Sequence, residues 1–180
     1  SGFTVIIPDL TDHYTTFASR KAEKDIWGDA PKMVETQALL DRIDLVFSWI
    51  GNKMNYSAGI PVIGIGWGGT QAYELGMNRR YLAALMVVSG QAPRSPGNLA
   101  RITAPVYSFL GGLDENLVHL EETKRYMKAS RKVFMPVVFP GAQASYMEDL
   151  LLQEREQDYK AGMATLSGIV AILHELYGGR

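Results

Sequence analysis

The 180-residue chain contains no cysteine, which excludes disulfide bonds and thiolate metal ligands. It has only three histidines, none paired at a spacing typical of zinc ligands, so no metal site is predicted. No apolar run reaches the roughly 18 residues that a membrane-spanning helix needs. The net charge of −1 provides no excess of positive charge for binding nucleic acid or anionic membranes. The sequence therefore predicts neither a nucleic-acid partner nor a membrane span.

The remaining composition is that of an ordinary globular domain, with 47% hydrophobic and 21% charged residues. A chain of 180 residues can bury a sizeable core, and no repeat, low-complexity tract or linker interrupts it. We therefore expect one domain over residues 1–180. The composition does not identify a cellular compartment, so both the cytoplasm and an organelle reached after processing stay open.

Short β-prone apolar runs alternate with segments of helical periodicity along the whole chain. Strands are expected at 3–7, 61–65, 83–88, 106–110 and 133–139, and helices at 31–50, 71–77, 117–129 and 157–177. The Pro- and Gly-rich residues 91–101 are expected to form a loop, and Pro136 indicates an edge position or a bulge for the last strand. This alternation predicts an α/β fold with a mostly parallel sheet and helices on both faces.

The most informative segment runs from Pro61 to Thr70 and reads PVIGIGWGGT. Its first half is typical of a buried strand, and a helix is expected to follow it. Enzymes of the α/β-hydrolase type place a nucleophilic Ser or Cys on such a strand-to-helix turn, with a glycine two residues to either side. The flanking glycines here are Gly64 and Gly68, and the residue between them is Gly66, which has no side chain with which to attack a substrate.

Four blocks, in this order along the chain, resemble the dienelactone hydrolase family. Residues 3–10 resemble the family's GY.V..PDLY strand, and 64–69 its G-[FY]-C-[FWL]-G-G elbow. Residues 110–114 are similar to the strand end that carries the acid, and 139–146 to the YPGAGHGF loop that carries the catalytic histidine. The resemblance covers nearly the whole chain. It implies an α/β-hydrolase fold and, in an active member, hydrolysis of small esters or lactones.

Two of the three catalytic residues implied by the resemblance are replaced in this chain. Gly66 stands in the position of the nucleophile and Ala144 in that of the histidine, while Asp114 remains in that of the acid. Without Ser or Cys there is no acyl-enzyme route, and without an imidazole there is no base. The family's earlier strands also have no counterpart, so a member lacking its N-terminal strands is expected. A small cleft is expected beside Trp67, Asp114 and Ser145, although Asp114 is equally suited to capping a loop.

These replacements predict an inactive protein that acts as a structural or interaction subunit, with a protein partner in a larger assembly. One alternative is a hydrolase of small esters or lactones with displaced catalytic groups, for which Ser145, Ser89 or Thr70 could supply a hydroxyl and His119 a base. A second alternative is a small-ligand or nucleotide binder that uses the Gly64–Gly69 turn, whose spacing matches G-x-G-x-x-G. The favoured interpretation involves no cofactor and identifies no small-molecule ligand.

Overall fold

The computed structural model describes residues 3–8, 10, 36–54, 59–147, 150 and 153–178. They fall into two compact units, Ser1–Ser57 and Ala58–Arg180, each of which is described by itself. The expectation for residues 13–30, a loop or a broken helix, lies outside the described residues.

The first unit contains helix α2, Thr36–Met54, which buries Leu39, Leu40, Ile43 and Ile50. This spacing confirms the amphipathic helix that the sequence predicts. The helix continues through Gly51, where a stop was expected, because a single glycine costs only about 1 kcal/mol within a helix. Nη1 of Arg42 donates a hydrogen bond to the carbonyl oxygen of Leu10 at 2.9 Å, which ties the start of the chain to α2.

Residues 3–7, which are expected to form a core strand, have no regular secondary structure. Their side chains include Val5 and Ile7, which are 69% and 89% exposed. A β-prone run becomes a strand only where another strand offers a hydrogen-bonding edge. The structure assigns no strand to residues 3–8, so the strand expected at 3–7 is not observed.

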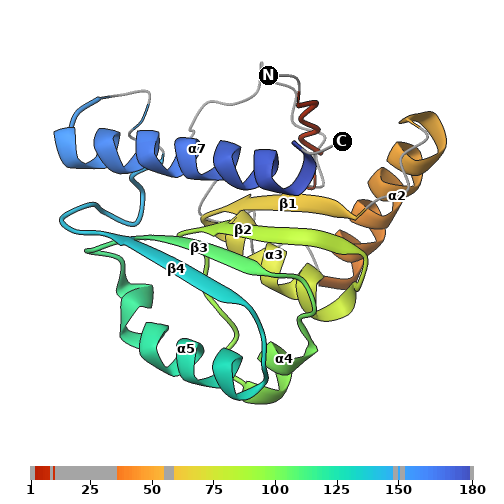
Figure 1. Cartoon of the computed structure of the whole chain (residues 1–180), viewed down its shortest axis with the longest axis horizontal. Coiled ribbons are helices and arrows are strands. Elements are labelled where there is room, and N and C mark those ends of the chain that lie inside the picture. Colours follow the sequence, from red (N-terminus) through yellow and green to blue (C-terminus); the bar gives the residue numbers. More distant parts are fainter. Residues whose placement is uncertain are drawn as a thin grey trace. The chain divides into compact units, whose positions relative to one another are not determined.

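The second unit is built on four parallel strands in the order β1-β2-β3-β4 (Figure 1). The strands are β1, Ile60–Ile65; β2, Leu82–Val88; β3, Val106–Gly111; and β4, Phe134–Phe139. The central strands β2 and β3 are almost entirely buried, whereas β1 and β4 are partly exposed. Pro136 lies in the edge strand β4, as predicted. An edge strand is paired on one side only, so no strand on its other side needs the N–H that proline lacks.

The helices cover both faces of this sheet. Helix α3, Trp67–Asn78, follows β1; α4, Pro96–Arg101, follows β2; and the 3-10 turn η2, Glu115–His119, leads into α5, Leu120–Ala129, after β3. These three helices lie on one side of the sheet, and α7, Glu156–Tyr177, lies on the other (Figure 1). The connections from β1 to β2, β2 to β3 and β3 to β4 all advance in the same direction across the sheet. Right-handed connections of this kind place their helices on one face. The predicted parallel α/β architecture is confirmed.

Helix α4 corrects the expectation that residues 91–101 form only a loop. The helix starts at Pro96 and follows Ser95 in the N-cap position. Proline suits the first turn of a helix because its fixed φ is helical and its missing N–H has no partner there. The same residues that indicated a loop therefore begin a short helix.

No helix in the described ranges is long and apolar enough to cross a membrane. Across those same ranges, no group of three or more His, Asp or Glu side chains is arranged to hold a metal ion.

Candidate functional site

A pocket of about 490 Å³ lies beyond the carboxyl ends of β1, β2 and β3. Parallel strands end at the same edge of a sheet, so the segments that follow them meet there. The residues that line the pocket are Gly66, Trp67, Thr70, Ser89, Gln91, Leu113, Asp114, Glu115, Asn116 and Ala144. Positions 66, 114 and 144, to which the resemblance assigns the three catalytic residues, therefore lie around one pocket. Trp67 also lines it, whereas Ser145 does not.

Gly66 forms the sharp turn between β1 and α3. Its φ of +55° and ψ of −120° lie in a region that residues with side chains rarely adopt. Its N–H donates to the carbonyl oxygen of Val88 at 2.8 Å, and its own carbonyl accepts from Gly69 N at 3.0 Å. A Cβ atom added at position 66 would meet nothing within 4 Å. The backbone has the shape of a nucleophile elbow with open space in place of the nucleophile.

Close backbone packing explains two of the neighbouring glycines. A Cβ at Gly64 would lie 2.3 Å from the carbonyl oxygen of Gly68, and one at Gly69 would lie 2.9 Å from the Cα of Gly90. The start of α3 thus packs directly on the end of β1 and on the segment after β2. This close packing by itself accounts for glycine at both positions, so no phosphate ligand is needed to explain them.

Asp114 lines the pocket at the end of β3 and is only 3% exposed. Its Oδ1 accepts a hydrogen bond from the backbone N–H of Asn116 at 2.9 Å and so caps η2, the role that turn chemistry suggested. Its Oδ2 is buried and has no hydrogen-bond partner in the described part of the chain. Burial raises the pKa of nearby Tyr146 to about 12, a rise that the hydrogen bond with Thr165 opposes and the charge of Asp114 reinforces.

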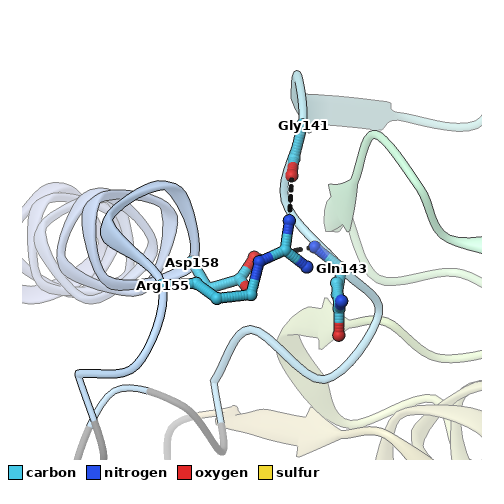
Figure 2. Close-up of polar contacts among 4 residues, drawn as sticks. All are labelled: Gly141, Gln143, Arg155 and Asp158. Carbon is cyan, nitrogen blue, oxygen red and sulfur yellow. Dashed lines mark hydrogen bonds and ion pairs between the residues drawn. The ribbon is translucent and has the colours of Figure 1, made fainter.

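The loop that carries Ala144 is held to the start of α7 by Asp158 and Arg155 (Figure 2). The backbone N–H of Gln143 donates to Oδ1 of Asp158 at 2.8 Å, and Nη2 of Arg155 donates to the carbonyl oxygen of Gly141 at 3.3 Å. Nε of Arg155 also lies 3.4 Å from Oδ2 of Asp158, which is 0% exposed. These contacts fix the backbone on the N-terminal side of Ala144.

Sequence reasoning missed both members of this anchor. Asp158 offered one signal, since an acidic side chain in the first turn of a helix favours the helix dipole. Nothing in the sequence indicated that Arg155 reaches a carbonyl group 14 residues earlier, because that contact depends on the tertiary fold.

The variant Asp158→Ala is expected to lower the free energy of unfolding by about 2–3 kcal/mol. It removes the acceptor of Gln143 N–H and leaves the guanidinium of Arg155 without its carboxylate. The expected loss lies below the full cost of breaking a buried pair because the Arg155 side chain is 34% exposed. Urea denaturation followed by circular dichroism measures the change. Glu156→Gln, which removes an exposed charge paired with Lys160 in the same turn, is the control and is expected to change stability much less.

Ser89, at the end of β2, has an unusual backbone. Its φ is +50°, and its buried Oγ has no hydrogen-bond partner among the described residues. Ser89→Gly is expected to raise the free energy of unfolding by about 0.5–1 kcal/mol, because glycine adopts positive φ without steric cost. Ser167→Gly inside α7 is the matched control and is expected to be destabilising by up to about 1 kcal/mol in the same denaturation experiment. A loss of stability in Ser89→Gly would contradict the strained conformation.

The lining of the pocket has no imidazole that could act as a base. Its polar side chains are hydroxyls, amides and the carboxyl groups of Asp114 and Glu115, and its lining includes no histidine. The hydroxyl of Thr70 already accepts a hydrogen bond from Gln91 N at 3.0 Å. His119 lines a separate pocket of only about 20 Å³. The site therefore presents hydroxyl groups without an imidazole beside them.

Several solved structures share this fold. A protein from Klebsiella pneumoniae subsp. pneumoniae assigned to the dienelactone hydrolases aligns with a TM-score of 0.71 at 17% identity, over 83% of this chain and 66% of its own. A dienelactone hydrolase-like promiscuous phosphotriesterase from metagenomic libraries aligns with a TM-score of 0.63 at 17% identity, over 89% and 68% of the two chains. Dienelactone hydrolase from Anabaena variabilis gives 0.54 at 17% identity, over 79% and 65%.

The chain thus spans about two thirds of the length of these structures. Among curated protein sequences, none matches this chain closely enough to count as a relative. The sequence model of the dienelactone hydrolase family matches residues 1–176, which is nearly the whole chain. The chain therefore belongs to the dienelactone hydrolase family.

Proposed function

We propose that this protein is a non-hydrolytic member of its family and acts as a structural or interaction subunit of a larger assembly. The observation that carries the proposal is Gly66, which occupies the centre of a well-formed elbow and has no side chain. Ala144, on the opposite loop of the pocket, likewise offers no imidazole. A hydroxyl group with no base beside it is a poor nucleophile, so Ser89 and Thr70 do not replace the missing pair.

An apolar stretch along the edge strand β4 supports a role in protein interaction. Val133, Met135, Val137 and Val138 are each between 38% and 52% exposed. Exposed apolar side chains gathered on a sheet edge are typical of surfaces that another protein covers. Pro136 removes one backbone donor from the middle of this edge, which favours packing of side chains over addition of a further strand.

The first experiment is the native mass of the protein purified gently from its source. The proposal predicts a stable complex much larger than the 19.9 kDa of this chain. Val137→Asp on β4 is expected to release the protein from the complex, because a charge on an apolar interface must be desolvated. Val118→Asp is the matched control, since Val118 is 78% exposed on η2 and lies outside this edge.

Two outcomes would contradict the proposal. One is a protein that is monomeric when purified from its source. The other is turnover of small esters or lactones that disappears in Asp114→Ala, which would favour the alternative of a hydrolase with displaced catalytic groups. The structure offers that alternative only the hydroxyl of Ser89, buried and unpartnered among the described residues, in the wall of the pocket.

A further inference from the structure

The carboxyl group of Asp114 has one satisfied and one unsatisfied oxygen. Oδ1 caps η2, whereas Oδ2 is closed to solvent and lacks a donor within the described ranges. A buried carboxylate oxygen without a donor is costly, and a donor that reaches it gains a charge-assisted hydrogen bond. In active relatives, the resemblance implies that an imidazole from the loop after the last strand meets this carboxyl group. Here that loop contributes only the methyl group of Ala144.

The electrostatics of the pocket favour a cation at this position. Its lining includes two acidic residues, Asp114 and Glu115, and no lysine, arginine or histidine. The N-terminus of α3 at Trp67 contributes about half a positive charge, which two carboxylates outweigh. Trp67 also lines the pocket, and an aromatic residue in the wall can attract an organic cation. The same charges disfavour anionic ligands, including phosphates.

The pocket also has the space that a small ligand needs. A Cβ atom added at position 66 would have no atom within 4 Å. Ala144, on the opposite loop, is small and exposed. The volume of about 490 Å³ lies within the range of pockets that hold small molecules.

From these observations we propose that the pocket binds small molecules with a protonated nitrogen, of the imidazolium, guanidinium or alkylammonium class. Oδ2 of Asp114 accepts the N–H after a shift of the side chain brings it to the pocket, Oδ1 keeps the backbone N–H of Asn116, and Trp67 lies in the same wall. The ligand occupies the place that the missing imidazole side chain would take. The buried acid thereby changes from orienting a catalytic base to recognising a ligand.

The probe is imidazole, added at a pH below its own pKa and followed through the backbone amide NMR signals of Gly66, Trp67 and Asp114. Saturable shifts are expected with a dissociation constant in the millimolar range, as suits so small a ligand. Asp114→Asn retains the cap on η2 but loses the charge, and it is expected to weaken binding about tenfold or more. Glu121→Gln, which removes an exposed charge on α5, is the control and should leave the affinity unchanged.

A second variant tests the position of the ligand without removing the carboxylate. Ala144→His should fill the site with its own imidazole and weaken binding of free imidazole about tenfold or more, whereas Gln143→His, one residue away and outside the pocket lining, should not. Pyrazole, a neutral ring of the same size, should bind more weakly than imidazolium. The proposal is overturned by the absence of saturable shifts, by wild-type affinity in Asp114→Asn or Ala144→His, or by equal binding of pyrazole.

Discussion

Replacing Gly64 with alanine is expected to lower the free energy of unfolding by about 3 kcal/mol or more. The added Cβ would lie 2.3 Å from the carbonyl oxygen of Gly68 and 2.8 Å from the Cα of Gly69. Both are backbone atoms, so no side chain can rotate to relieve the contact, and β1 and α3 must separate. Urea denaturation of the variant, followed by circular dichroism, measures this loss.

Two other glycines of the same turn provide matched controls for Gly64→Ala. Gly66→Ala places its methyl group in open space and should cost only about 1 kcal/mol, because φ at this position is +55°. Gly68→Ala also meets nothing within 4 Å and lies in the first turn of α3, so it should be neutral or slightly stabilising. If Gly64→Ala were no more harmful than Gly66→Ala, the close crossing of β1 and α3 would be contradicted.

The central part of the fold could be predicted because its sequence signal is local. The run that forms β2 is continuously apolar and that of β3 is apolar apart from Ser108, as expected for strands buried on both faces. Residues 3–7 have the same kind of sequence but form no strand, since pairing depends on a neighbour that propensity cannot supply. Helix α4 was missed because Pro96 is compatible with both a loop and a first helical turn.

The candidate site followed from motif spacing combined with the topology of the sheet. Gly66, Asp114 and Ala144 lie far apart in sequence, yet each follows a parallel strand, and such strands end at one edge. Ser145 was expected beside the cleft, but Ala144 lines the pocket in its place, because the residue that faces the pocket depends on how the loop is anchored. The anchor at Asp158 and the positive φ of Ser89 are tertiary features with little or no signal in the sequence.

Restoring the two missing side chains together is expected to restore covalent reactivity. In the double variant Gly66→Cys/Ala144→His, the thiol would stand at the elbow and the imidazole across the pocket, beside Asp114. General-base assistance of this kind contributes about 10²-fold or more, so acylation by p-nitrophenyl acetate should be about 10²-fold faster than in Gly66→Cys alone. Because this chain contains no cysteine, an acetyl group that mass spectrometry finds in the double variant but in neither the parent protein nor Ala144→His lies on the introduced thiol.

The control for this experiment moves the thiol without changing the histidine. Gly68→Cys/Ala144→His also places its Cβ in open space near the N-terminus of α3, but two residues beyond the elbow. Proximity to a helix N-terminus lowers the pKa of both thiols, so a difference between the two variants isolates the pairing with the imidazole. Equal acylation rates in the two double variants would show that positions 66, 114 and 144 do not form a catalytic geometry. A faster reaction at position 66 would show that positions 66, 114 and 144 keep a catalytic geometry and lack only the two side chains.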